Sequence, residues 1–173
     1  VLLLAAGFEA AWGLHGARPG ATVRLGLAPV GAEAPAPSDE AALRPLAARL
    51  EEVLARDVPA GPLDASAAEA AVRRELSAFA PGVRLPRRVK RLPPGWLGPL
   101  GVAGVISPWT LEAHVDGGLP AWARVAASAH ELAHLAGFAA EADAELLGLL
   151  AALRADHPHA RYCLLYTSPS PRD

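Results

Sequence analysis

Hydrophobic and polar positions recur with helical spacing in two stretches of the first half of the chain. The first stretch covers residues 38–57, where Pro45 marks a kink or the true first turn. Its apolar face consists of Leu43, Leu46, Leu50, Val53 and Leu54. The second stretch covers residues 66–79 and opens with Ser66 and Glu69 in a capping-box pattern. These two amphipathic helices predict a packing layer.

Two short extended runs follow a stretch that is too rich in proline and glycine for regular structure. That stretch covers residues 81–99. The extended runs are residues 101–107 and 111–115, and Pro108-Trp109-Thr110 separates them. The pattern predicts a small hairpin or two edge strands.

Helical spacing returns in two stretches on either side of a glycine. Pro120 is well placed as the first residue of a helix that carries residues 130–134, and Gly137 should end this helix. Another helix runs from about Ala140 to Asp156. Its inward-facing residues are predicted to be Leu146, Leu149, Leu150 and Leu153. The patterns together predict a mainly α protein with a small β hairpin or sheet, an α+β fold.

The composition agrees with a helical protein, because 52% of the 173 residues are hydrophobic and Ala and Leu supply most of them. The formal net charge is −2, and we treat the lysines and arginines as scattered along the chain without a basic stripe. Nucleic acid is therefore not an expected partner.

Residues 1–16 have the character of the end of a truncated transmembrane helix. The apolar run is too short to span a bilayer, which takes about 20 residues. Trp12 followed by Arg18 and Arg24 is typical of an interfacial anchor, whereas Glu9 favours a buried helix of a soluble domain. Residues 17–37 are predicted to be a linker, since Gly, Ala and Pro are frequent there.

The single cysteine, Cys163, begins a tail at residues 163–173 that resembles a translated sequencing adapter. We therefore leave this tail out of the fold prediction. The alternative is a natural Pro/Ser-rich tail. The predicted folded unit is residues 38–162, and we expect the natural protein to continue beyond it.

The chemistry is concentrated in His130-Glu131-Leu132-Ala133-His134. Two imidazoles four residues apart share a helix face and can bind one metal ion. Zinc in a hydrolytic site uses three protein ligands and leaves one position for water. His130 and His134 supply two ligands, and Glu131 can act as the general base.

Three acidic residues shortly after the pentad are candidates for the third ligand. Glu141 and Glu145 are four residues apart and share a helix face, while Asp143 points roughly 200° away from Glu141. Gly137 allows the chain to reverse and return over the metal. The alternative is a solvated first helical turn, where carboxylates favour the positive end of the helix dipole.

The other candidate histidines have simpler explanations. His114 lies in the second extended run and could face the cleft, although a lone strand histidine is more often a surface residue. His157 and His159 flank Pro158 beyond a helix end and are predicted to be solvated loop residues or partners of the helix C-terminal dipole. No Gly-rich phosphate loop, Gly-x-Ser-x-Gly elbow or Cys-centred triad occurs.

Several blocks of the sequence resemble a known family in order. They are Trp12-Gly13-Leu14 with Arg18-Pro19, residues 104–115 with Ser-Pro-Trp-Thr-Leu-Glu-Ala, residues 130–139, and Arg161-Tyr162. Over residues 1–162 the chain is similar to the bacterial membrane family catalogued as domain of unknown function 3810.

This resemblance implies N-terminal transmembrane helices, of which residues 1–16 would be the end, followed by a zincin-like metallopeptidase domain. It favours Glu141 as the third ligand, because related membrane peptidases carry Glu-x-x-Ala-Asp or Asn after the pentad. The present string ends in Glu145, which puts the hydrogen bonding around the histidines in doubt. One extended run would form the edge of the substrate cleft, and Glu112 would orient the hairpin or a substrate.

We therefore expect a zinc-dependent peptidase of the bacterial cell membrane, with Zn²⁺ on His130, His134 and Glu141. Its expected partners are a peptide or protein substrate and, through the N-terminal segment, membrane lipid. Two alternatives stay open: a catalytically inactive membrane scaffold, with or without zinc, and a soluble helical domain in which the pentad is accidental.

Overall fold

The computed structural model describes residues 61–107 and 109–167 of the 173-residue chain. Its elements in chain order are α4 (Ala65–Phe79), β1 (Lys90–Leu92), the 3-10 turn η1 (Gly98–Leu100), β2 (Gly104–Ser107), β3 (Glu112–Asp116), α5 (Ala121–Leu135), α6 (Glu141–Arg154) and α7 (Pro158–Thr167). Within these residues the fold is mixed, with four helices and a three-stranded sheet, which confirms the α+β prediction. The predicted transmembrane remnant, linker and helix at residues 38–57 lie outside the described residues.

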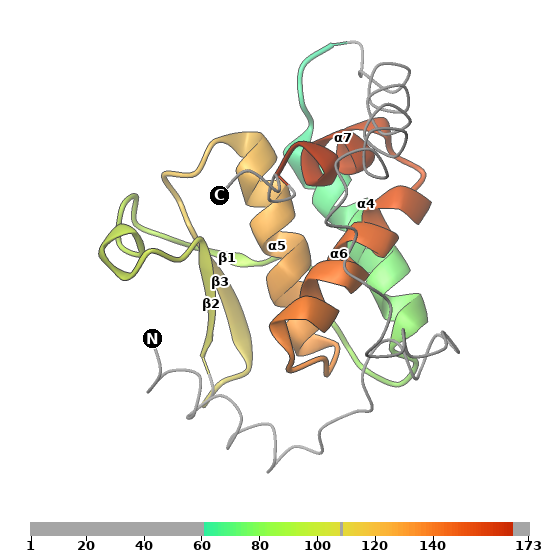
Figure 1. The fold of residues 1–173 in the computed structure, drawn as a ribbon, viewed down its shortest axis with the longest axis horizontal. Coiled ribbons are helices and arrows are strands. Elements are labelled where there is room, and N and C mark those ends of the chain that lie inside the picture. Colours follow the sequence, from blue (N-terminus) through green and yellow to red (C-terminus); the bar gives the residue numbers. More distant parts are fainter. Residues whose placement is uncertain (1–60, 108, 168–173) are drawn as a thin grey trace, which may run out of the picture.

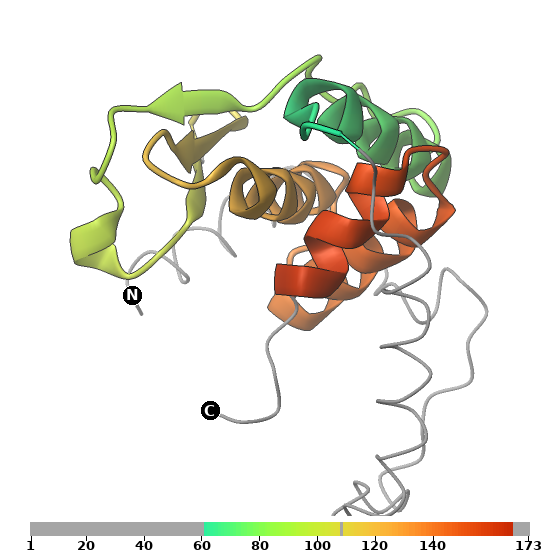
Figure 2. The same cartoon turned by 90° about the horizontal axis from the view of Figure 1, so that it is seen from above.

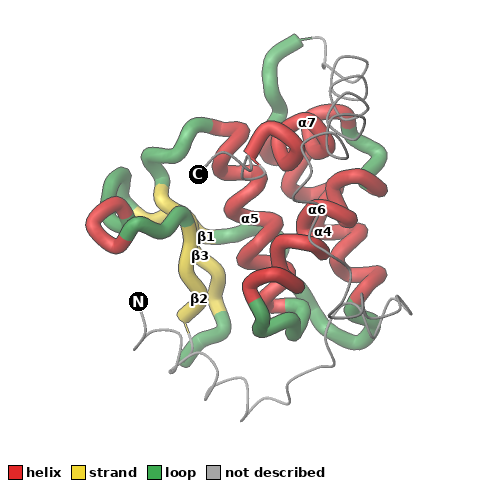
Figure 3. The backbone as a smooth tube through the Cα atoms, in the orientation of Figure 1, coloured by secondary structure: helices red, strands yellow, loops and turns green. Residues whose placement is uncertain are grey.

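Helix α5 occupies the middle of the described fold. The sheet lies on one side of it, where α5 contacts β2 and β3, and helices α4, α6 and α7 lie on the other side (Figures 1 and 3). The view from above in Figure 2 shows the same separation of strands and helices. The helix that carries the pentad is therefore covered by both parts of the molecule.

Helix α6 packs on α5 through small residues. The buried residues of α6 are Ala144, Leu147, Gly148, Ala151 and Ala152. A Cβ atom on Gly148 would lie 3.6 Å from the Cβ of Ala129, so the two helices approach closely at this point. The prediction that Leu153 faces inward is wrong, because it is 39% exposed. Close helix packing places the small residues and Leu147 on the inner face and leaves Leu153 outside it.

The three strands pair in the order β1-β3-β2, with β1 parallel and β2 antiparallel to β3. The predicted hairpin is confirmed as β2 and β3, with Ser107 opposite Glu112. The prediction that residues 81–99 lack regular structure is wrong, since β1 and η1 form there. Pro86 and Pro93 flank β1 without interrupting it, so three residues remain free to pair with β3.

The start of α4 also differs from the prediction. Asp64 caps this helix, because its Oδ1 accepts a hydrogen bond from the Ala67 N–H at 3.0 Å. The predicted capping box of Ser66 and Glu69 is therefore wrong at its cap position. An aspartate two residues earlier is an equally good cap and lengthens the helix.

Helix α7 replaces the solvated loop predicted around His157 and His159. Pro158 opens this helix, a position that suits a residue without an N–H, and His159 lies within it. The helix continues to Thr167, and Cys163 is fully buried. The second half of α7 lies in the tail that resembles an adapter, and the origin of residues 163–173 stays a prediction.

None of the helices in residues 61–107 and 109–167 has the length and apolar character needed to cross a bilayer.

Candidate metal centre

The two histidines of the pentad face each other on α5. Their Nε2 atoms are 3.0 Å apart, and their rings are nearly perpendicular, with centroids separated by 4.6 Å. His134 is buried, while the His130 side chain is 31% exposed. The two histidines therefore share a helix face as predicted. The His134 ring lies in the core, and the His130 ring lies nearer the surface.

The turn that ends α5 also orients His134. Gly137 has φ +104°, its N–H donates to the His134 carbonyl at 2.8 Å, and the Phe138 N–H donates to the Ala133 carbonyl at 3.4 Å. These are the two hydrogen bonds of a Schellman turn, and they confirm the predicted role of the glycine. The turn places the Phe138 carbonyl 2.7 Å from His134 Nδ1.

This backbone contact decides how the His134 ring presents its nitrogens. A carbonyl oxygen can only accept, so Nδ1 carries the proton and Nε2 offers its lone pair to the site. Burial lowers the pKa of His134, which favours the neutral ring that a metal requires. The sequence left open which group hydrogen-bonds the histidines, because Glu145 departs from the family-like pattern. For His134 this group is the backbone carbonyl of Phe138.

Glu141 completes the group. Its Oε2 lies 3.0 Å from His130 Nε2, and its Oε1 lies 3.5 Å from His134 Nε2. One ligand atom from each of the three residues lies within 4.8 Å of the others. Glu141 is the first residue of α6, so the chain reversal at Gly137 brings it back over the pentad.

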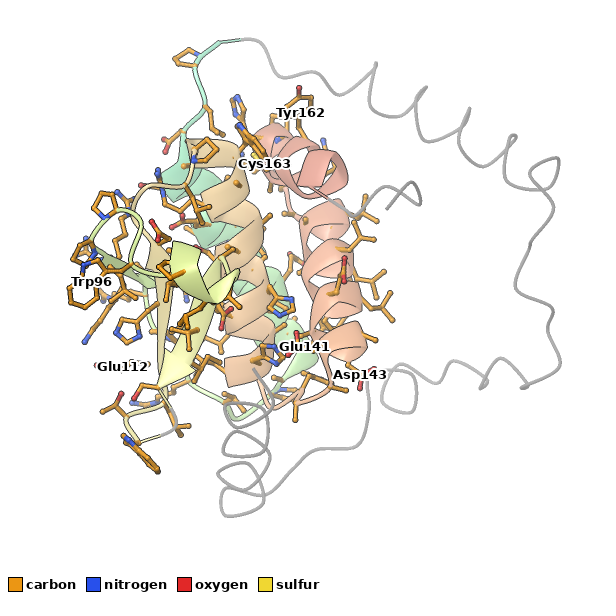
Figure 4. The ribbon with its side chains drawn as sticks, turned by 60° about the vertical axis from the view of Figure 1, so that its left-hand side comes forward. Trp96, Glu112, Glu141, Asp143, Tyr162 and Cys163 are labelled. Atoms are coloured by element: carbon orange, nitrogen blue, oxygen red, sulfur yellow. The ribbon has the colours of Figure 1, made fainter. Side chains whose placement is uncertain are left out.

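Neither of the other two acidic candidates belongs to this group. Figure 4 shows Glu141 on the side of α6 that faces α5 and Asp143 on the outer side. Glu145 is exposed on the next turn of the helix. Of the three carboxylates that the sequence left open, the structure brings Glu141 to the histidines.

The donor set and its spacing fit a zinc ion. Zinc prefers imidazole nitrogen and carboxylate oxygen at about 2.0–2.2 Å in tetrahedral geometry, which separates neighbouring ligand atoms by about 3.3–3.5 Å. His130 Nε2 lies 3.0 Å from both His134 Nε2 and Glu141 Oε2, and the other carboxylate oxygen, Oε1, lies 3.5 Å from His134 Nε2. With one ligand atom taken from each residue, the atoms lie within 4.8 Å of one another. A small cation thus fits among these atoms with minor adjustment of side chains.

Glu131 lies beside this group in a buried position. Its side chain is only 7% exposed, and burial, followed by the charge of Glu141, raises its pKa to about 8. The raised pKa belongs to a protein without a cation, because nearby positive charge favours the ionised carboxylate. A cation bound by the neighbouring histidines would therefore lower the pKa of Glu131.

Strand β2 passes directly over this carboxylate. A Cβ atom on Gly104 would lie 2.6 Å from Glu131 Oε1, which is closer than real contacts allow. A larger residue at position 104 would therefore force the Glu131 side chain or strand β2 to move. Sequence reasoning missed this role, since nothing near residue 104 in the chain points to Glu131.

The remaining candidates lie outside the group. His114, on β3, has its Nδ1 3.1 Å from the Glu112 carbonyl oxygen, and His157 and His159 lie together at the start of α7 with ring centroids 5.6 Å apart. Glu112 accepts a hydrogen bond from Lys90 Nζ at 2.6 Å, which lowers the pKa of Glu112 and ties β1 to β3.

Asp116 is a second residue that sequence reasoning missed. It is buried at the end of β3, and its carboxylate accepts hydrogen bonds from the N–H groups of Gly95, Leu97 and Gly118 at 2.7–3.0 Å. These bonds lower the pKa of Asp116. The following Gly117-Gly118 predicts a turn. It does not predict the hydrogen bonds from Gly95 and Leu97, which lie about twenty residues earlier in the chain.

Comparison with known proteins gives one match. The sequence model of the family described as "Protein of unknown function (DUF3810)" matches residues 1–167. No curated protein and no solved structure gives a match.

Proposed function

The chain belongs to the family of proteins of unknown function DUF3810, and we propose that it is a zinc-dependent peptidase anchored in the bacterial cell membrane. The observation that carries this proposal is the meeting of His130, His134 and Glu141 beside a buried Glu131. A site that only held zinc would have no need of the fourth residue. This buried carboxylate therefore favours an enzyme over a scaffold.

His130, His134 and Glu141 would hold the zinc. When bound in such a site, zinc lowers the pKa of water to about 7 and polarises a carbonyl oxygen. The Phe138 carbonyl keeps the His134 ring in the tautomer that this role requires.

Glu131 would move the proton. It takes a proton from the water that attacks the scissile carbonyl carbon, and it delivers this proton to the amine nitrogen as the C–N bond breaks. Its burial between α5 and β2 keeps its carboxylate in one place and limits competition from bulk water.

A peptide is the substrate class that the neighbouring strand favours. Within the described residues β2 pairs with β3 alone, so its other edge is free to accept an extended chain. Gly104 of this strand lies against Glu131. A peptide added to β2 would thus run close to the base, which agrees with a zincin-like arrangement.

Membrane anchoring would come from residues 1–16, which lie outside the described residues. Fractionation of cells that express the chain tests this part, and recovery only in the soluble fraction would contradict it.

Zinc content and peptide hydrolysis of the purified chain test the core of the proposal. We expect one zinc ion per chain and cleavage of a peptide library that a chelator abolishes. Glu141→Ala should weaken zinc binding more than about a hundredfold, since it removes a ligand. The matched variant Glu145→Ala, one turn along the exposed face of α6, should leave zinc binding unchanged.

The alternatives give different results. Zinc binding without hydrolysis of any peptide would support the inactive scaffold. A purified chain that binds no zinc would contradict the metal site itself.

A further inference from the structure

The segment that joins β1 to β2 presents apolar side chains to the outside. In this β1–β2 loop (residues 93–103), Trp96 is 67% exposed, Leu100 50% and Val102 40%. Figures 1 and 2 both show the loop projecting beyond the rest of the described fold. Figure 4 shows Trp96 on the strand side of the molecule, away from α6. Exposed apolar groups gathered in this way mark a surface for interaction.

The exposure of Trp96 is built into the fold. The residues on both sides of it, Gly95 and Leu97, donate their N–H groups to the buried carboxylate of Asp116. Leu97 itself is only 4% exposed and anchors the loop in the interior. Trp96 is therefore held outward on a turn that is fastened at each end, so little conformational entropy is lost when it binds a partner.

A basic segment leads into this loop. Residues 84–91 contain Arg84, Arg87, Arg88, Lys90 and Arg91, and no Asp or Glu occurs anywhere in residues 76–111. All five side chains belong to exposed residues. The description of the lysines and arginines as scattered is therefore wrong for this region.

Within residues 61–107 and 109–167, ion pairs neutralise only part of this positive charge. Lys90 pairs with Glu112, and Arg91 lies close enough to Glu69 to affect its pKa. Arg84, Arg87 and Arg88 have no ion pair with any residue of the part that the structure describes. Three guanidinium groups without an ion pair in the described part of the chain thus precede, along the sequence, the loop that exposes Trp96 and Leu100.

We propose that the β1–β2 loop and the basic segment together dock the folded domain on an anionic lipid bilayer. Trp96 and Leu100 enter the headgroup region, and Arg84, Arg87 and Arg88 bind lipid phosphates. Tryptophan is enriched at the membrane–water interface, and clusters of basic side chains close to this interface bind anionic lipids. Leu100 and Val102 favour lipid over nucleic acid, where stacking aromatic side chains would be expected instead.

This contact is separate from the anchor proposed in residues 1–16, and it needs neither zinc nor catalysis. Its position has a consequence for the proposed peptidase. Gly104 immediately follows the loop and touches Glu131. A bilayer held against the loop would keep the base close to the membrane surface.

Vesicle binding of the full chain tests the proposal. We expect tighter binding to phosphatidylcholine vesicles that contain phosphatidylserine than to phosphatidylcholine alone. Trp96→Ser with Leu100→Ser should weaken binding to the anionic vesicles about tenfold. Arg87→Gln with Arg88→Gln should weaken it about twenty-five-fold, at about fivefold for each charge. Trp109→Ser is the matched control, since Trp109 is 89% exposed at the far end of the β2–β3 hairpin.

A fluorescent label separates loop docking from tethering by the N-terminal segment. The buried Cys163 has a pKa raised to about 11 and should not react, so an environment-sensitive dye can be placed on Leu100→Cys or, as control, on Leu153→Cys of α6. The dye at position 100 should shift to the blue with anionic vesicles while the dye at 153 does not. Equal responses, no response at 100, or a response at 100 to nucleic acid alone would overturn the proposal.

Discussion

Two buried carboxylates of nearly equal exposure have pKa values that shift in opposite directions in this protein. Asp116 at the end of β3 is 6% exposed, and Glu131 on α5 is 7% exposed. Three backbone N–H groups surround Asp116 and lower its pKa, whereas burial and the neighbouring Glu141 raise the pKa of Glu131 to about 8. Burial alone therefore does not decide in which direction the pKa of a carboxylate shifts; its hydrogen-bond donors and charged neighbours do.

The comparison indicates that an ionised Glu131 lowers the stability of the fold, whereas an ionised Asp116 raises it. Asp116 stabilises the fold because its charge is met by donors from three residues. Glu131 is kept where its charge is unfavourable, beside Glu141 and under Gly104. A group retained in such a position is typical of a functional site.

The largest expected effect is on hydrolysis in Glu131→Gln. This change keeps the size of the side chain and removes the base, so peptide hydrolysis should fall about a hundredfold to ten-thousandfold while one zinc per chain is retained. Zinc analysis and a peptide-cleavage assay on the same preparation check both parts. Retained hydrolysis would contradict the role of Glu131.

Gly104→Ala should have the next largest effect. The added Cβ would lie 2.6 Å from Glu131 Oε1, so the carboxylate or strand β2 must move. A displacement of this kind should lower kcat about a hundredfold without loss of zinc. Gly98→Ala is a matched control, because its Cβ meets nothing within 4 Å. Similar loss of activity in the two variants would argue against a specific contact.

The stability of the metal-free protein should respond to Glu131 in a pH-dependent way. Its pKa rises from 4.5 in the unfolded chain to about 8 in the fold, so the fold favours the protonated carboxyl. The carboxyl adds no cost below about pH 4.5, and the cost grows as the pH rises toward 8. With a chelator present, Glu131→Gln should therefore raise the free energy of unfolding by a few kcal/mol at pH 8 and by little at pH 4.5.

Urea unfolding at the two pH values measures this difference. The same gain at both values would show that the substitution acts through packing and not through ionisation.

Asp116→Ala should lower the stability of the fold, by less than Glu131→Gln raises it at pH 8. The lowered pKa means that Asp116 stabilises the fold above its ordinary pKa of 3.8, and that this stabilisation disappears as the pH falls through its folded value. The variant should lose several degrees of Tm at neutral pH, and the loss should shrink in acid. Thermal unfolding followed by circular dichroism checks this, with the exposed Asp156→Ala as control. A loss of Tm that is as large in acid as at neutral pH would show that Asp116 does not act through its charge.

Local patterns predicted those features whose causes are local. The shared face of His130 and His134 follows from helix geometry, and the end of α5 follows from the ability of Gly137 to adopt a positive φ. The β2–β3 hairpin follows from two extended runs around a short turn. Each of these depends on residues within about a dozen positions of one another.

The features that were missed depend on distant partners or on competition between good candidates. Strand β1 exists because β3 pairs with it, and Asp64 takes the cap that Ser66 could have filled. The leucine pattern predicts one inner face for α6, but the residues buried against its neighbours are mostly small ones such as Ala144, Gly148 and Ala151. Hydrophobicity alone does not indicate how near two helices will pack.

The sequence by itself determined the pentad, its place on one helix, and a short list of carboxylates that could join it. Only the tertiary structure shows that Glu141 is the carboxylate that lies close to both histidines. It also brings Gly104 into contact with Glu131, and the Phe138 carbonyl within hydrogen-bonding distance of His134. The physical reason is that helix periodicity places side chains relative to their own axis. The distance between α5, α6 and β2 is decided by how their side chains pack together.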